Sequence, residues 1–183
     1  MMNLSRLRTS IGSERLSLTV LEATSVTPSY VQWLNKREIN EFLESRFTPQ
    51  TEESVKSFVD ENFESSHSVL FGIFVGPEQT HIGNIKLGPI NNNHATSEIG
   101  FIIGDSSFWG LGYASEAILS LSEWAFSVLA ISKLTAGCYS TNIGSKKALE
   151  KAGYIQEAAL RSQVLDVSGN RQDMLKFYKF ASG

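Results

Sequence analysis

Apolar residues recur along this chain with two different periods, and the period changes several times. Runs with a period of two, rich in β-branched and aromatic residues and bounded by Gly, Pro or Asn, predict strands. The predicted strands lie at 15–22, 69–75, 81–87, 97–103, 133–139, 154–164 and 174–180. Short turns join the second, third and fourth of these runs, so they are expected to form an antiparallel meander.

Elsewhere the apolar residues recur every three or four positions, which predicts helices with one face on a core. Thr27 offers a capping hydroxyl just before Pro28, and Thr51 precedes two acidic residues, so a helix is expected to begin at each. The other predicted helices lie at about 39–43, 113–129 and 145–152. The last of them should end at Gly153, which can serve as a C-terminal cap.

Strands and helices in this order predict an α+β fold, with one mixed, largely antiparallel sheet of about six to seven strands flanked by helices. A length of 183 residues, without a repeat or an interdomain linker, fits a single domain over 1–183. The polar stretch 1–13 is expected to be a loose N-terminal arm.

The segment 98–117 carries the clearest functional signal. It predicts a buried strand, a break at Gly104, and a loop in which Gly110 and Gly112 directly precede a helix. Free amides and the dipole of a helix N-terminus favour an anion, so this loop is a candidate pyrophosphate site. It is not a P-loop, because no Gly-Lys-Ser/Thr follows, and the dinucleotide pattern Gly-x-Gly-x-x-Gly fails at Ser115. A tight turn without a ligand is the alternative that the spacing alone leaves open.

Composition excludes several classes of protein. Sixteen basic and nineteen acidic residues give a net charge of −3, which argues against a nucleic-acid binder that relies on charge. A single cysteine, Cys138, permits no internal disulfide and favours the cytoplasm. No apolar run is long enough for a signal peptide or a membrane span, so no membrane partner is expected. The three histidines and one cysteine lack the spacing of metal ligands, so no metal is expected.

Two strings resemble the GNAT acetyltransferases, in particular the branch related to the ribosomal-protein acetylases RimJ and RimL. Phe108-Trp-Gly-Leu-Gly-Tyr-Ala-Ser-Glu-Ala117 is similar to the acetyl-CoA loop of that family. Asn142-Ile-Gly-Ser145, followed by Glu150-Lys-Ala-Gly-Tyr154, is similar to its Asn-x-x-Ser…Glu-Lys-x-Gly-Phe/Tyr segment. The resemblance covers roughly residues 15–180, and members of the branch often form dimers, so a homodimer is expected by analogy.

The resemblance implies acetyl-CoA as cosubstrate, bound where two sheet strands splay apart. The main chain of the strand at 101–103 would form hydrogen bonds with the pantetheine arm. The glycine loop would bind the diphosphate, and Asn142 would contact the pantetheine arm from the side of the other strand. The implied cofactor-binding residues are Phe101, Ile102, Ile103, Trp109, Gly110, Leu111, Gly112, Tyr113, Ala114, Ser115, Asn142 and Ser145. Asn142 alternatively acts as a helix cap or turn residue.

The implied reaction is attack of a neutral amine on a thioester, which needs alignment, an oxyanion donor and removal of a proton. A main-chain amide near Ile102 is the candidate oxyanion donor. Much of the wider family has a tyrosine that assists the thiolate, and Leu149 stands at that position here. Ser145 is then the candidate donor to the thiolate, with helix capping as the alternative role. Glu98 is the candidate base, with a carboxylate paired to a neighbouring cation as its alternative.

An acceptor amine of low pKa suits a site without an obvious strong base. The expected acceptor is therefore a protein or peptide N-terminal α-amine, or an amino sugar, which could be nucleotide-linked. The candidate substrate-binding residues are Trp33, Arg46, Lys86 and Glu98, and the cations among them could meet phosphates. A non-catalytic acyl-CoA sensor or scaffold on the same fold is the alternative function, supported by the missing tyrosine at Leu149.

Overall fold

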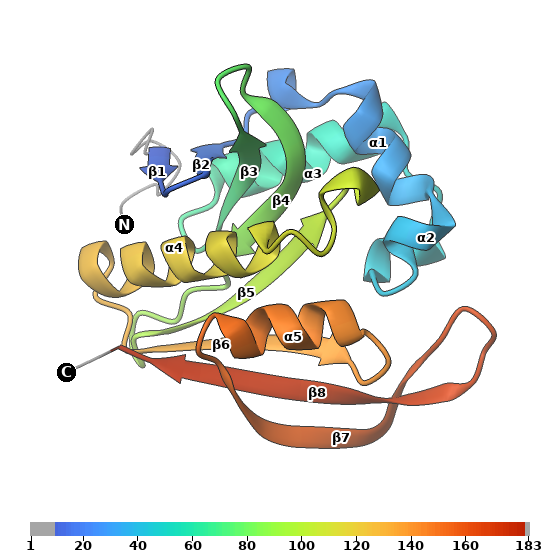
Figure 1. Cartoon of the computed structure of the whole chain (residues 1–183), viewed down its shortest axis with the longest axis vertical. Coiled ribbons are helices and arrows are strands. Elements are labelled where there is room, and N and C mark those ends of the chain that lie inside the picture. The colour runs from blue at the N-terminus through green and yellow to red at the C-terminus, as the bar shows by residue number, and fades with distance from the viewer. Residues whose placement is uncertain (1–9, 182–183) are drawn as a thin grey trace.

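The computed structural model describes residues 10–181, which form one eight-stranded sheet with helices on both faces (Figure 1). The strands are β1 (Ser10–Gly12), β2 (Leu16–Val20), β3 (Val69–Val75), β4 (Thr80–Leu87), β5 (Thr96–Ile103), β6 (Lys133–Tyr139), β7 (Ile155–Leu165) and β8 (Arg171–Phe180). The α-helices are α1 (Pro28–Asn35), α2 (Arg37–Asn40), α3 (Glu52–Glu64), α4 (Tyr113–Val128) and α5 (Ile143–Lys151).

The predicted mixed sheet is confirmed, with one strand more than expected. Its order is β1-β2-β3-β4-β5-β6-β8-β7, and β5–β6 is the parallel pair among otherwise antiparallel neighbours. The extra strand is β1, whose residues Ser10–Gly12 pair with Ser17–Thr19 of β2. The prediction of a loose arm over 1–13 is therefore wrong for 10–12, because three residues are too few to show a period. The rest of that predicted arm, 1–9, lies outside the described residues.

The sheet separates two apolar clusters. One contains residues of α4 and α5 packed on β-strand side chains that include Ile99. The other contains residues of α1, α2 and α3, with Ile102 packed against it. Successive side chains of a strand point to opposite faces, so β5 supplies both clusters from alternate positions.

The predicted helix starts are confirmed at Thr27 and Thr51, whose side chains accept hydrogen bonds from Tyr30 N–H and Ser54 N–H. The helix predicted at 39–43 is shorter and earlier: α2 ends at Asn40, and a 3₁₀ turn follows at Glu44–Phe47. Helix α5 begins at Ile143, two residues before the predicted start.

The sheet opens in its middle. β5 and β6 pair from Thr96–Ile99 to Lys133–Ala136, and their register goes no further. Beyond that point β5 continues along β4, and β6 continues along β8. The predicted splayed strand pair is thus present between 100–103 and 137–139.

Candidate active site

A cleft of about 840 Å³ lies where β5 and β6 diverge. It collects nearly all of the predicted cofactor-binding residues from three separate segments. Those that line it are Phe101, Ile102, Ile103, Trp109, Gly110, Gly112, Tyr113, Ala114, Ser115, Asn142 and Ser145. Leu111 instead lines a neighbouring groove of about 790 Å³, which shares Gly112, Ser115 and Lys151 with the cleft.

The main chain of β5 presents alternate residues to this gap. Glu98 O accepts a hydrogen bond from Gly88 N–H, and Gly104 N–H donates to Ile82 O, both on the β4 side. Residues two apart along a strand point their polar groups to the same side. Ile102 lies opposite Asn84 in this register, so its amide faces β4. The polar groups that face the gap are those of Phe101 and Ile103, so the oxyanion donor expected near Ile102 would be one of these two amides and not that of Ile102.

The glycine loop enters α4 without a side-chain cap. Gly110 and Gly112 have φ angles of 75° and 86°, and Gly112 is the N-cap residue of α4. Positive φ disfavours residues with a Cβ, so glycine is required for this path. Trp109 Nε1 donates to Ile103 O at 2.8 Å and anchors the loop to β5. The amides of the first turn of α4 are thus left for a ligand.

The opposite wall of the cleft contains the start of α5. Asn142 is the N-cap residue, and its Oδ1 accepts a hydrogen bond from Ser145 N–H at 3.0 Å. The cap of α5 is therefore Asn142, and the alternative that Ser145 caps it is wrong. Ser145 lines the cleft, whereas Leu149 is fully buried in the core.

Glu98 is not among the described residues that line the cleft. Its Oε1 lies 3.2 Å from Lys176 Nζ, and its side chain is 43% exposed. It is therefore paired with a cation and not desolvated. Gly100, the next residue on the same face, does line the cleft, and a Cβ there would meet no atom within 4 Å.

The other candidate substrate residues are scattered. The indole of Trp33 is 7% exposed and packs on Gly104, where a Cβ would lie 2.1 Å from its Cδ2, so Trp33 is a core residue. Lys86 lies over the Phe58 ring of α3, with Nζ 5.4 Å from the centroid. Neither belongs to the described wall of the cleft.

Arg46 is close to the cleft, and its guanidinium is bonded to three protein oxygens. It donates from Nη1 to Tyr139 Oη and Glu41 O, at 3.2 and 3.1 Å, and from Nη2 to Leu165 O at 2.5 Å. Tyr139 in turn donates to Glu44 Oε1 at 2.8 Å. Burial, with the hydrogen bond to Glu44, raises the pKa of Tyr139 to about 12, so its hydroxyl keeps its proton.

Sequence reasoning missed Tyr139 and its contact with Glu44, and both residues line the cleft. They are 95 positions apart, and no local pattern shows that they meet. Glu38 and Glu41 also line the cleft, so the segment from α2 to the 3₁₀ turn at Glu44–Phe47 contributes three carboxylates to its wall. Glu38 is paired with Lys36, so Glu41 and Glu44 are the carboxylates that favour a cationic group at that end.

Cys138 lines the cleft as well, although its side chain is mostly covered. Burial raises the pKa of its thiol to about 11, so the thiol is neutral at physiological pH. Within 10–181, no cluster of three metal-ligating side chains occurs. The helices described there include none long and apolar enough to cross a membrane.

A parallel strand pair that splays beside a bare glycine loop at a helix N-terminus is the site expected for a GNAT acetyltransferase. The chain belongs to this family: it matches the acetyltransferase (GNAT) domain over residues 15–155.

Two curated Bacillus proteins are similar in sequence. YjcK of Bacillus subtilis (strain 168), named a probable N-acetyltransferase, is 32% identical over 57% of this chain and 58% of its own length. The uncharacterized N-acetyltransferase p20 of Bacillus licheniformis is 27% identical over 81% of this chain and 84% of its own. The matched segment thus spans less than two thirds of YjcK.

Two solved structures share the fold. RimL, a ribosomal L7/L12 α-N-protein acetyltransferase in complex with coenzyme A, has a TM-score of 0.83 at 17% identity, over 94% of this chain and 98% of its own. A spermidine N-acetyltransferase from Vibrio cholerae, in complex with CoA and spermine, has a TM-score of 0.80 at 20% identity, over 90% and 95%.

Proposed function

We propose that this protein transfers the acetyl group of acetyl-CoA to a primary amine by direct attack in a ternary complex. The observation that carries the proposal is the cleft between the diverging strands β5 and β6, which ends at the uncapped N-terminus of α4. The gap supports an extended pantetheine arm, and the amides of Gly110–Ser115 support a diphosphate. The sheet holds both strands, and Trp109 anchors the loop to β5. We therefore expect alignment of the two reactants to supply most of the rate enhancement.

In the proposed reaction the amine nitrogen forms a bond to the thioester carbonyl carbon, and the carbon–sulfur bond then breaks. The developing oxyanion takes a hydrogen bond from a gap-facing amide of β5, at Phe101 or Ile103. The Ser145 hydroxyl donates to the departing thiolate. The amine loses one proton to a carboxylate, and water returns a proton to the thiolate.

Two carboxylates compete for the role of base. Glu98 is held by Lys176 outside the cleft wall, whereas Glu44 is in the wall and accepts a hydrogen bond from Tyr139. The position of Glu44 makes it the stronger candidate. The Glu44→Gln change should lower kcat, whereas Glu98→Gln should leave kcat unchanged. The reverse pattern assigns the base to Glu98.

The charges of the wall also bear on the acceptor. Glu41 and Glu44 line the acceptor end, where Glu38 is paired with Lys36, and the guanidinium of Arg46 is bonded to protein oxygens. Lys86 lies against α3. These positions favour an amine without a phosphate, so a peptide N-terminal α-amine is preferred to a nucleotide-linked amino sugar. The activities for which RimL and the spermidine enzyme are named are consistent with an unphosphorylated amine.

An acceptor screen tests the proposal. Release of the coenzyme thiol from acetyl-CoA is followed with N-terminal peptides, polyamines, free amino sugars and nucleotide-linked amino sugars. Turnover is expected with an unphosphorylated amine, and highest activity with a nucleotide sugar overturns the choice of acceptor. Calorimetric binding of CoA without turnover on any acceptor supports the acyl-CoA sensor instead.

A further inference from the structure

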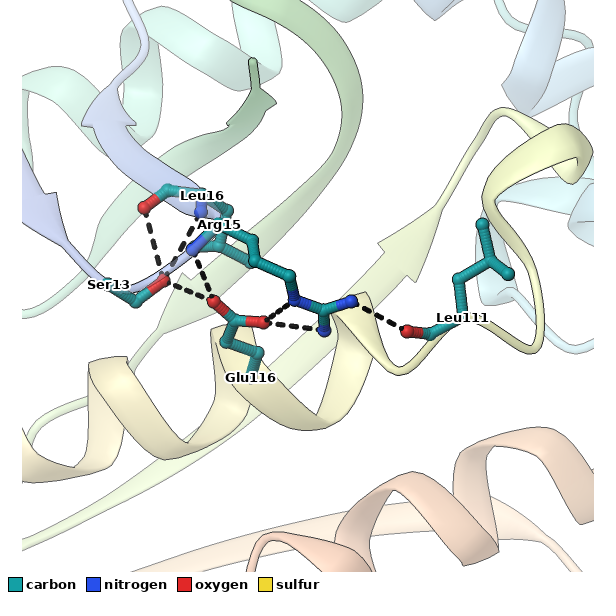
Figure 2. Close-up of polar contacts among 5 residues, drawn as sticks. All are labelled: Ser13, Arg15, Leu16, Leu111 and Glu116. Carbon is teal, nitrogen blue, oxygen red and sulfur yellow. Dashed lines mark hydrogen bonds and ion pairs between the residues drawn. The ribbon is translucent and has the colours of Figure 1, made fainter.

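Glu116, in the first turn of α4, binds a corner of the chain about one hundred residues away (Figure 2). Its Oε1 accepts hydrogen bonds from Ser13 Oγ at 2.7 Å and from Arg15 N–H at 2.9 Å. Its Oε2 accepts a hydrogen bond from Arg15 Nε at 2.7 Å and forms an ion pair with Arg15 Nη2 at 2.6 Å. Two nitrogens of the Arg15 guanidinium thus contact the Glu116 carboxylate. This charge-assisted contact fixes the orientation of the two side chains as well as the distance between them.

The remaining nitrogen of the same guanidinium reaches the glycine loop. Arg15 Nη1 donates to Leu111 O at 3.0 Å, as Figure 2 shows. The guanidinium carbon also lies 4.5 Å from the centroid of the Tyr113 ring. Arg15 therefore joins the β1–β2 corner to the loop and to the first residue of α4.

The bond to Leu111 O has a consequence for the next amide. The peptide between Leu111 and Gly112 is trans, so its N–H points opposite to its C=O. Leu111 and Arg15 line the groove and Gly110 lines the cleft, whereas Gly112 lies between the two and lines both. Because Arg15 holds the carbonyl of Leu111 on the groove side, the N–H of Gly112 points away from Arg15, and we expect it to face the cleft. Glycine on both sides of Leu111 leaves this peptide free to rotate without such a restraint.

The pairing of Arg15 with Glu116 also changes the net charge at the start of α4. A carboxylate in the first turn of α4 would repel a diphosphate at the same helix end. Burial alone would raise the pKa of Glu116, but hydrogen bonds from Ser13 and Arg15 outweigh it, so its pKa is lowered and it stays ionised. Arg15 compensates that charge. A Cβ at Gly112 would lie 3.5 Å from Arg15 Nη2 and 3.4 Å from Lys151 Nζ, so two cations flank the loop.

We propose that Arg15 and Glu116 form a positioning pair that sets the Leu111–Gly112 peptide for the coenzyme's diphosphate and thereby determines coenzyme affinity. This inference rests on the proposed function, because it assumes that the loop holds that diphosphate. Neither residue acts on the acetyl group or on the acceptor.

The test measures CoA binding by calorimetry, and KM and kcat with the best acceptor, for Arg15→Gln, Glu116→Gln and the double variant. Each single change should raise the CoA Kd and the acetyl-CoA KM about tenfold, as for the loss of one charge-assisted hydrogen bond. The kcat and the acceptor KM should stay within about twofold. The double variant should bind CoA no more weakly than the weaker-binding single variant, because both changes break the same contact between Arg15 and Glu116.

Two further variants separate positioning from folding. Arg15→Lys keeps the charge but cannot donate to Glu116 and Leu111 at once, so it should bind CoA nearly as weakly as Arg15→Gln. Arg161→Gln removes a comparable ion pair with Asp173 on the β7–β8 hairpin and should leave CoA binding unchanged. The inference is overturned if the Arg15 variants lose melting temperature but keep the wild-type CoA Kd. In that case the proposed function stands, whereas a wild-type protein that does not bind CoA refutes both.

Discussion

At the scale of single residues, the cleft depends on the backbone conformation of two glycines. Gly110 and Gly112 adopt φ angles that a residue with a Cβ rarely adopts. The sequence indicates these positions clearly, because two glycines directly before a helical period are typical of a tight turn into a helix. What it does not indicate is Arg15, which holds the loop from the other end of the sequence.

The Gly112→Val change should raise the acetyl-CoA KM by at least about tenfold, because a β-branched residue disfavours positive φ and moves the loop amides. The control is Gly169→Val in the β7–β8 turn, where φ is 82° and a Cβ would meet no atom within 4 Å. Both variants should lose similar thermal stability, as measured by calorimetry. An unchanged KM in Gly112→Val would remove the loop from coenzyme binding.

The thiol of Cys138 should react slowly with disulfide reagents. With a pKa of about 11, roughly one thiol in a thousand is ionised at pH 8, against about a quarter for an ordinary cysteine. The reaction rate should therefore keep rising with pH well beyond 9. Cys138 is the single cysteine of the chain, so the reagent reports on it alone, and denatured protein is the control. A rate that levels off near pH 8.5 would contradict the burial of this thiol.

At the scale of elements, most helices and strands follow from the apolar period and from capping residues. Strands β3 and β6 have the predicted bounds, and α3 begins where Thr51 indicated. The failures are short elements. β1 has three residues and α2 has four, so tertiary pairing decides them and the local pattern does not.

The Asn142→Ala change should destabilise the protein by about 1 kcal/mol, since α5 loses its N-cap. Thr51→Ala, which removes the cap of α3, should have a similar effect on the melting temperature. Asn142 lines the cleft, so the Asn142 variant should also bind CoA more weakly, and the Thr51 variant should not. Equal CoA affinities for the two variants would restrict Asn142 to capping.

At the scale of the whole molecule, the acceptor end of the cleft is assembled from distant segments. Arg46 follows α2, Tyr139 ends β6, and Leu165 ends β7. One guanidinium thus ties the helical wall to two strands of the sheet. This arrangement places the Glu44 carboxylate in the wall, beside the Tyr139 hydroxyl.

The Arg46→Leu change should raise the acceptor KM about tenfold, because the helical wall of the cleft loses its hydrogen bonds to β6 and β7. It should also lower the melting temperature, because the oxygens that accept from Arg46 lose their partner. The CoA Kd should change by less than about twofold, since the glycine loop does not contact Arg46. Arg171→Leu, whose hydrogen bond to Ser162 O stays within the β7–β8 hairpin, is the control. Loss of CoA affinity in the Arg46 variant would contradict this separation of the two ends.

The sequence by itself determined the periods of the strands and helices, the glycine loop and the Asn142–Ser145 turn, because each depends on residues within a few positions of one another. Only the tertiary structure decided that Ile102 turns its amide to β4, that Trp33 belongs to the core, and that Arg15 and Glu116 meet. Strand pairing and helix packing set these contacts between residues far apart in the chain. Local propensity does not encode which distant side chain completes a hydrogen bond, so the wall of the acceptor site and the support of the loop emerged only with the fold.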